Sequence, residues 1–177
     1  MPHPYSVNLC VTSLSGKEYH VRVLVFDASR CTGCHTCEET CAQTWFKVSD
    51  RGLSSIQILD GKAAPEGNGL FQAITCTQCG KCIDVCPTQA LSRAKNGVVR
   101  RDLSLCVGCL ACVGFCPVGA ELGAAAMRAH PAHVEPFKCV ACGACARACP
   151  EEALAVVELE NAPPTATERF AQRKASK

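Results

Sequence analysis

Sixteen of the seventeen cysteines in this chain fall into four groups that share one spacing, Cys-x2-Cys-x2-Cys-x3-Cys. The four groups, called quartets one to four below, are Cys31/Cys34/Cys37/Cys41, Cys76/Cys79/Cys82/Cys86, Cys106/Cys109/Cys112/Cys116 and Cys139/Cys142/Cys145/Cys149. A proline directly follows the last cysteine of quartets two, three and four. This spacing is typical of the thiolate ligands of [4Fe-4S] clusters. The sequence therefore predicts four such clusters, with these sixteen cysteines as iron ligands.

The spacing suits a cubane because each of its four iron corners needs one thiolate. Three cysteines separated by two residues lie on a tight loop that wraps three corners, while the fourth opens a short helix and points away. In proteins with two clusters this fourth cysteine ligates the other cluster. Proline suits the next position because it tolerates the first turn of a helix and donates no hydrogen bond there.

Two other uses of cysteine fit less well. Structural zinc prefers Cys-x2-Cys pairs separated by roughly a dozen or more residues, whereas each quartet here crowds four thiols into eleven residues. A disulfide framework is typical of small secreted chains, and the first ten residues, MPHPYSVNLC, lack the pattern of a signal peptide.

Composition and charge limit the remaining possibilities. Aromatic residues make up only 5% of the 177 residues, so the clusters must fill much of the interior and we expect the cluster-free chain to be unfolded. The formal charge of +2 counts cysteines as neutral; with four oxidised clusters bound it becomes about −6. We expect no nucleic-acid partner. No run of eighteen apolar residues occurs, so we expect no membrane insertion and a cytoplasmic location.

The quartets repeat along the chain at steps of 45, 30 and 33 residues. The shortest step encloses ALSRAKNGVVRRDL, which predicts a β-hairpin with its turn at Asn96-Gly97. Quartets two and three therefore predict an inner module, residues 76–116. Quartets one and four then pair around it as an outer module, made of residues 1–30, 31–75 and 117–160, followed by a basic tail, 161–177.

The segments between the quartets predict an α+β fold: two nested ferredoxin-like modules of β-hairpins and short helices, with a small core built around the clusters. A hairpin is expected over 5–27, with its first arm carrying the lone Cys10, and strands are expected at SSIQIL, LFQAI and ALAVVEL. The Ala-rich stretch before Pro131 predicts a helical turn.

Three segments carry a family resemblance: FDASRCTGCHTCEETCAQ, TCTQCGKCIDVCPTQAL and NGVVRRDLSLCVGCLACVGFCPVGA. They resemble the four-cluster ferredoxin-type subunits of molybdenum and tungsten oxidoreductases, hydrogenases and carbon monoxide dehydrogenase. The resemblance covers about residues 20–160. It implies a non-catalytic subunit that passes single electrons between a large catalytic subunit with a metal or flavin cofactor and a redox partner.

The resemblance also implies which cysteines share a cluster. The implied sets are Cys76/Cys79/Cys82/Cys116, Cys106/Cys109/Cys112/Cys86, Cys31/Cys34/Cys37/Cys149 and Cys139/Cys142/Cys145/Cys41. Spacing alone also allows quartet one to pair with two and three with four.

The sequence indicates the partner enzyme less specifically than the type of subunit. Quartet two is unstretched between its second and third cysteines, unlike many subunits of the dimethyl-sulfoxide-reductase type. CTGCHTCEETCAQTWFK followed by SSIQI is similar to the small electron-transfer partners of tungsten aldehyde oxidoreductases. That resemblance implies a tungsten or molybdenum subunit as partner, with formate dehydrogenase, hydrogenase and carbon monoxide dehydrogenase as alternatives. A flavin subunit or a soluble ferredoxin would then be the second redox partner.

No catalytic motif occurs in the sequence. Lys81 in quartet two and His35 in quartet one are candidates for tuning the nearby clusters, although a solvated loop lysine and an uninvolved histidine are the simpler interpretations. His130 and His133 are interpreted as surface histidines. Two other functions stay open: a free-standing polyferredoxin, and an iron–sulfur sensor that controls transcription. Four clusters in line also allow end-to-end self-association.

Overall fold

A computed structural model of the chain describes residues 20–60, 71–118, 126–132 and 135–160. The expected first arm of the N-terminal hairpin, Cys10, His133 and the basic tail lie outside these residues. Within them, short helices and two-stranded sheets are mixed, as the expected α+β class requires. No helix among them is long and apolar enough to cross a membrane.

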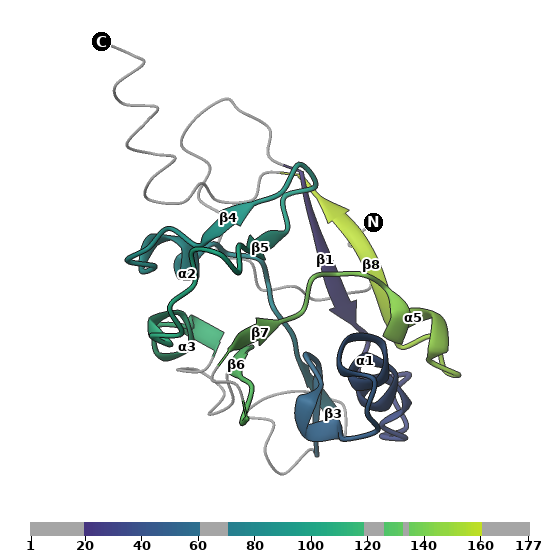
Figure 1. Cartoon of the computed structure of the whole chain (residues 1–177). Helices are drawn as coiled ribbons and strands as arrows, with labels where there is room; N and C mark the ends of the chain where they lie inside the picture. Colours follow the sequence, from purple (N-terminus) through teal and green to yellow (C-terminus); the bar gives the residue numbers. More distant parts are fainter. Residues whose placement is uncertain (1–19, 61–70, 119–125, 133–134, 161–177) are drawn as a thin grey trace.

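Each sheet is an antiparallel pair of strands (Figure 1). Strand β1 (Val21–Phe26) pairs with β8 (Leu154–Leu159), and β2 (Gln57–Asp60) pairs with β3 (Phe71–Ile74). Strand β4 (Leu91–Arg93) pairs with β5 (Val99–Arg101), and β6 (Met127–Ala129) pairs with β7 (Pro136–Lys138). The strands expected at SSIQIL, LFQAI and ALAVVEL are confirmed, and so is the hairpin that turns at Asn96-Gly97.

Strand β1 finds its partner at the other end of the described chain. Val21 lies opposite Leu159 and Phe26 opposite Leu154. Val21, Val23 and Val25 are buried on one face and pack against alternate residues of β8. This pairing joins the segment before quartet one to the segment after quartet four.

The Ala-rich stretch was predicted to form a helical turn, and for its described part this is wrong. Met127–Ala129 is strand β6, paired with Pro136–Lys138. Met127 is 3% exposed and packs beside Cys82 and Cys112. Pairing with β7 and burial of Met127 therefore override the helical preference of the alanines.

Four helices begin within the quartets: α1 (Thr36–Phe46), α2 (Lys81–Asp84), α3 (Ala111–Gly114) and α5 (Ala144–Ala148). In Figure 1, α2 and α3 lie together with β4 and β5 on one side of the molecule, and α1 and α5 lie together beside β1 and β8 on the other. The β6–β7 hairpin lies between these two groups. A short 3-10 helix, η1 (Arg51–Leu53), follows α1 and leads to β2.

The two sides meet where the β4–β5 turn touches the start of β1. The Asn96 carbonyl accepts a hydrogen bond from the Arg22 amide at 3.2 Å. Gly97 has φ of +74°, and a Cβ there would overlap the His20 carbonyl oxygen and lie 2.7 Å from the Val21 Cα. Only glycine fits this turn, because both its backbone conformation and its contact with β1 exclude a side chain.

Candidate iron–sulfur cluster sites

The loops of all four quartets share one backbone conformation. In each quartet the residue two positions after the first cysteine and the residue directly after the second cysteine have positive φ. These residues are Gly33 and His35, Gln78 and Gly80, Gly108 and Leu110, and Ala141 and Gly143, with φ between 50° and 84°. Four of the eight are not glycine, although left-handed backbone is uncommon for such residues. The spacing of the cysteines therefore corresponds to one loop structure used four times.

The cysteines of each loop differ in exposure in a regular way. The third cysteine lies in the first turn of the following helix and is buried in every quartet: Cys37, Cys82, Cys112 and Cys145. The second cysteine is exposed in three quartets, as Cys34, Cys109 and Cys142, and partly buried as Cys79. All sixteen are free thiols. Each loop thus reaches from the surface to the core.

Three cavities are lined by residues of these loops, and each lining includes four cysteines. One is lined by Cys31, Cys34, Cys37 and Cys149; a second by Cys76, Cys79, Cys82 and Cys116; a third by Cys86, Cys106, Cys109 and Cys112. Each has about 320–330 Å³ of space between protein atoms, part of it open to solvent. In every case three cysteines come from one quartet and the fourth from another. The near-equal sizes and identical donor sets indicate three sites of one kind.

The remaining four cysteines gather where α1 packs against α5. Cys41 of α1 and Cys145 of α5 belong to one core cluster, with Cys139 packed against it. The negative charges of Cys41 and Cys142 both act on the pKa of Cys145. Cys41 and Cys142 therefore face the same small region as the other two.

The donor chemistry fits clusters better than single ions. Within the described residues, no three or more Cys, His, Asp or Glu side chains are arranged to hold one metal ion. Three of the four sets of thiols surround a cavity instead of converging on a point. Four thiolates spread around a cavity are what a four-iron cubane requires.

Burial sets the protonation of these thiols. It raises the pKa of Cys37, Cys82 and Cys139 to about 12, and it raises the pKa of Cys145 as well. Neighbouring cysteines add to the shift because buried like charges repel. Without a bound cation these four thiols are protonated at neutral pH, so iron must displace their protons to bind.

Backbone amides already point at several sulfur atoms. Gly33 and Ala141 donate to Cys31 and Cys139 of their own loops, both at 3.4 Å. Ser55 donates to Cys41 at 3.3 Å, and Ala153 donates to Cys149 at 3.4 Å. Such hydrogen bonds stabilise negative charge on sulfur and raise the reduction potential of a bound cluster.

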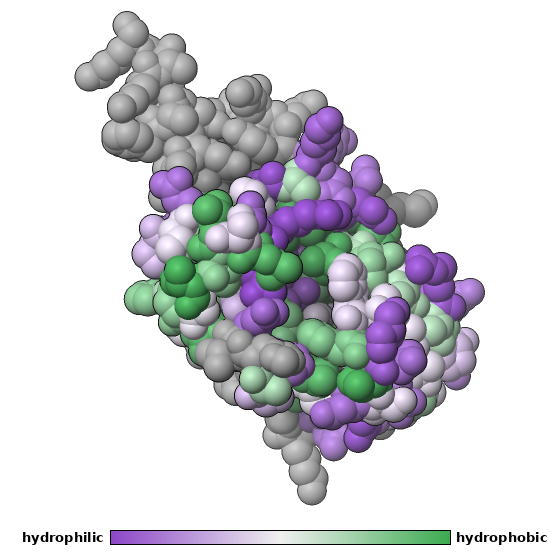
Figure 2. All heavy atoms as spheres, in the orientation of Figure 1, coloured by the Kyte–Doolittle hydropathy of each residue, from purple (hydrophilic) through white to green (hydrophobic). Residues whose placement is uncertain are grey.

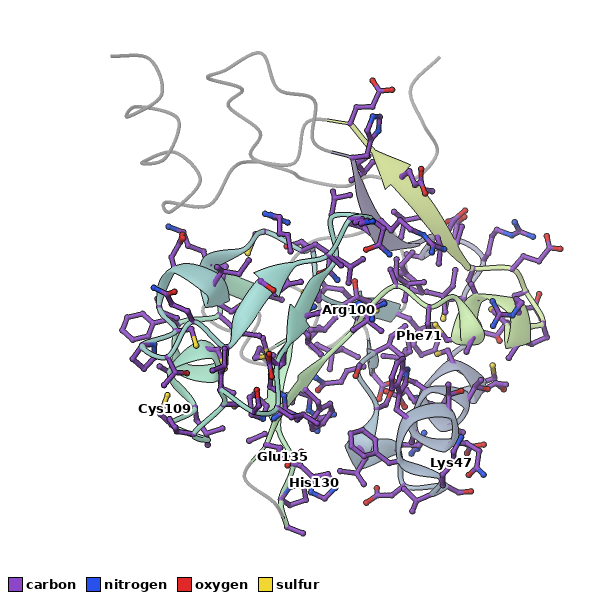
Figure 3. All side chains as sticks on the ribbon, turned by 45° about the horizontal axis from the view of Figure 1, so that its top comes forward. Lys47, Phe71, Arg100, Cys109, His130 and Glu135 are labelled. Atoms are coloured by element: carbon purple, nitrogen blue, oxygen red, sulfur yellow. The ribbon has the colours of Figure 1, made fainter. Side chains whose placement is uncertain are left out.

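A side chain that the sequence did not single out also reaches a sulfur atom. The guanidinium of Arg101 lies 3.9 Å from the Cys106 sulfur and forms an ion pair with Glu135 at 3.2 Å. Figure 3 shows Cys109, from the same cavity, at the outer edge of this side of the molecule. Arg101 thus places a positive charge beside an exposed site.

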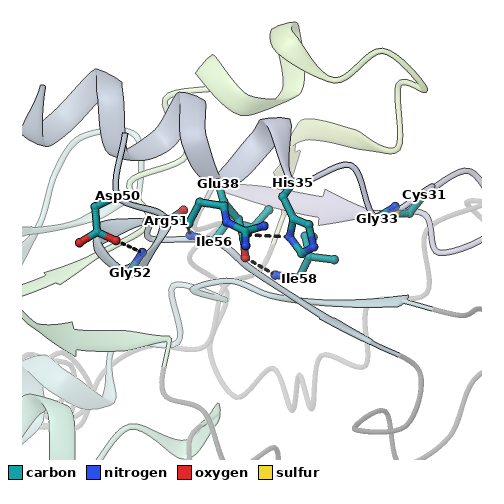
Figure 4. A network of polar contacts seen from close by, with 10 residues as sticks. Cys31, Gly33, His35, Glu38, Asp50, Arg51, Gly52, Ile56 and Ile58 are labelled. Atoms are coloured by element: carbon teal, nitrogen blue, oxygen red, sulfur yellow. Dashed lines mark hydrogen bonds and ion pairs between the residues drawn. The ribbon is translucent and has the colours of Figure 1, made fainter. Parts of the chain in front are cut away.

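A buried carboxylate organises the surroundings of quartet one (Figure 4). Glu38, 7% exposed, accepts a hydrogen bond from the Ile58 amide at 2.8 Å. Its other oxygen lies 2.8 Å from His35 Nδ1 and 3.7 Å from the Arg51 guanidinium. The Glu38 charge, after burial, is the largest factor that raises the pKa of Cys37. Glu38 therefore connects the first loop, η1 and β2.

The two proposed tuning residues lie in different surroundings. His35 lines the cavity of Cys31, Cys34, Cys37 and Cys149, so a role in tuning stays a prediction. Lys81 begins α2 but is exposed to solvent, where water screens its charge. His130 contacts the Phe46 ring, with ring centroids 5.3 Å apart.

Comparison with known proteins agrees with this geometry. Three models described as "4Fe-4S dicluster domain" match residues 30–91, 75–120 and 98–150. Residues 30–150 are therefore similar throughout to ferredoxin-type [4Fe-4S] dicluster domains arranged in tandem.

Relatives among curated proteins share about a third of the matched residues. The uncharacterized ferredoxin-like protein YdhX of Escherichia coli K12 is 34% identical over 105 residues, which is 57% of this chain and 47% of YdhX. The thiosulfate reductase electron transfer subunit PhsB of Salmonella typhi is 35% identical over 101 residues, 54% of this chain and 52% of PhsB. The electron transport protein HydN of Escherichia coli K12 is 37% identical over 102 residues, 56% of this chain and 58% of HydN. The chain thus spans about half the length of these relatives.

Proposed function

We propose that the chain binds four [4Fe-4S] clusters in two nested modules, the inner formed by residues 76–116 and the outer by 1–75 and 117–160. The single observation that carries this proposal is the crossed lining of the three cavities, in which quartets two, three and four each contribute their fourth cysteine to another quartet. Cys116 joins quartet two, Cys86 joins quartet three and Cys149 joins quartet one. The fourth set, Cys139, Cys142, Cys145 and Cys41, completes the same scheme. Pairing of quartet one with two and of three with four is not favoured by these linings.

The proximity of thiols orders the four sets along a line. The charge of Cys37 raises the pKa of Cys145, so the fourth set lies near the Cys31/Cys34/Cys37/Cys149 set. The charge of Cys76 raises the pKa of Cys139, so the fourth set also lies near the Cys76/Cys79/Cys82/Cys116 set. The charge of Cys112 raises the pKa of Cys82, so this set in turn lies near the Cys86/Cys106/Cys109/Cys112 set. The order is therefore quartet one, quartet four, quartet two, quartet three, named by the loop that supplies three ligands.

This order suits a subunit that conducts electrons and is not itself an enzyme. A bound [4Fe-4S] cluster supplies one-electron chemistry, and its potential is set by charge, hydrogen bonds and exposure. Each proposed set supplies four thiolates, one for each iron corner, so it leaves no corner for a substrate. The two ends of the line reach the surface at Cys34 and Cys109.

Exposed apolar side chains flank Cys109 in the sequence. Leu103, Val107 and Phe115 are between 66% and 69% exposed, and Leu105 is 48% exposed. Figure 2 shows apolar side chains on this face over α2 and α3. We propose that the large catalytic subunit docks here. Uncharged apolar side chains can pack against a partner subunit without charge repulsion and so bring its cofactor close to the cluster site at Cys109.

The finer proposal for the partner is a tungsten or molybdenum aldehyde oxidoreductase subunit, with a flavin subunit or a soluble ferredoxin as second redox partner. Its support is the unstretched quartet two and the likeness of the first loop to the small partners of tungsten enzymes. PhsB is named as a subunit of a thiosulfate reductase, so partners of other reductases and of formate dehydrogenase, hydrogenase or carbon monoxide dehydrogenase are the alternatives. HydN is named as an electron transport protein, and its name favours a free-standing polyferredoxin as the second candidate.

Anaerobic purification of the native protein, followed by metal analysis, tests this function. We expect a stable complex with a large subunit, containing tungsten or molybdenum and iron above about sixteen atoms per chain. Iron near sixteen atoms with no partner would indicate a mobile polyferredoxin. Size analysis over a range of concentrations tests end-to-end self-association, and cell fractionation tests the expected cytoplasmic location.

A further inference from the structure

The junction between the two modules contains a buried polar side chain, Gln78 of quartet two. Gln78 is 1% exposed. Its Nε2 donates to the Cys139 carbonyl at 2.8 Å, and its Oε1 accepts from the Val99 amide at 3.1 Å. Quartet two of the inner module is thereby fixed to quartet four of the outer module.

Lys138 brings a positive charge to this junction. It ends β7, directly before Cys139, and its ammonium donates to Gln78 Oε1 at 3.0 Å and to the Cys139 carbonyl at 3.2 Å. Both of its acceptors are neutral. Among the described residues, no carboxylate forms an ion pair with Lys138.

The negative groups that Lys138 faces are cysteines of two different sets. Lys138 directly precedes Cys139, and its ammonium donates to Gln78, which lies two residues after Cys76 in the loop of quartet two. Cys76 and Cys82 line the cavity that also contains Cys116, whereas Cys139 lies with Cys41 and Cys145. A charge in this position stabilises added negative charge on both sets, since a partly buried charge is weakly screened.

We propose that Lys138 is the shared positive charge of the two middle sites and raises the reduction potentials of both bound clusters relative to those at the two ends. This inference rests on the proposed function, because it assumes that both sets hold clusters. It assigns to Lys138 the role that the sequence suggested for Lys81. The two lysines differ because Lys138 is held by two polar groups of the junction, whereas Lys81 is exposed.

The experiment compares the reduction potentials of individual clusters in the intact holo-protein, measured by a redox titration followed by electron paramagnetic resonance. Lys138→Gln retains a hydrogen-bond donor but removes the charge, and we expect two of the four potentials to become more negative while the other two are unchanged. Lys138→Arg keeps the charge, and we expect wild-type potentials. Lys81→Gln is the matched control, and we expect no comparable shift in any potential.

Gln78→Glu gives a second test, because it places a negative charge beside the Lys138 ammonium without altering the lysine. We expect the same two potentials to fall. If Lys138→Gln loses its middle clusters while Lys138→Arg is fully loaded, the charge is required at this place and the proposal is supported. Cluster loss in all three variants, or unchanged potentials in the variants that load, would overturn it. Wild-type protein that binds fewer than four clusters would instead refute the proposed function.

Discussion

Substitution of Glu38 by alanine tests whether the buried carboxylate holds the first loop together. Glu38→Ala leaves the backbone amide of buried Ile58 without its acceptor and removes the carboxylate that faces His35 and Arg51. An unsatisfied buried donor costs about 1–3 kcal/mol, and a hydrogen bond to a charged group contributes about 1.5–3 kcal/mol. We therefore expect a loss of about 2–3 kcal/mol in the free energy of unfolding.

The assay is the rate of cluster loss in urea under anaerobic conditions, followed by visible absorbance with an iron chelator present. If the contact breaks before the transition state for unfolding, a loss of 2–3 kcal/mol accelerates release by up to about 30- to 150-fold. Glu38→Gln keeps an acceptor for Ile58 and should lose much less. Glu39→Ala is the matched control, since Glu39 is the next residue of α1 and is exposed.

The reasoning would be refuted if Glu38→Ala released its clusters no faster than Glu39→Ala. It would also be refuted if Glu38→Gln were as unstable as Glu38→Ala, because the Ile58 hydrogen bond would then contribute nothing. Equal iron content in the purified variants is needed before the rates are compared.

Three further predictions concern the module contact, the exposed end and the ligand sets. Gly97→Ala should destabilise the holo-protein by at least about 1–2 kcal/mol through its left-handed backbone alone, and more through overlap with β1; faster cluster release than wild type is the readout, and an unchanged rate would contradict the contact. Arg101→Gln should lower the potential of one cluster only, because it removes the charge beside Cys106; a redox titration that shows four unchanged potentials would contradict this. Cys34→Ala and Cys149→Ala combined should remove no more iron than either alone, about four atoms per chain, whereas pairing of quartets three and four predicts the loss of two clusters.

The sequence predicted the loops well because their information is local. Cysteine spacing alone indicated the candidate ligands, and the four loops that carry them share positive φ at the same two positions. The hairpin at Asn96-Gly97 was likewise predictable, since its turn residues determine its geometry. Local patterns of this kind need no knowledge of the remaining chain.

Features that depend on distant pairing could not be predicted. The pairing of Val21–Phe26 with Leu154–Leu159 joins strands more than a hundred residues apart, and no local signal marks such a partner. Met127–Ala129 resembled a helix until its pairing with β7 was known. The same holds for Lys138, whose place beside Gln78 depends on how the β6–β7 hairpin lies against quartet two. In the sequence, the signal for Lys138 was its position directly before Cys139, the first cysteine of quartet four.

The most direct test of the account is the number of electrons that the purified holo-protein accepts. Iron, acid-labile sulfide and electrons are measured on one anaerobic sample, the electrons by coulometric titration. The account predicts about sixteen iron atoms, about sixteen sulfides and about four electrons per chain. One zinc ion per quartet with no electron uptake, or loading that stops at two clusters in correctly folded protein, would contradict it.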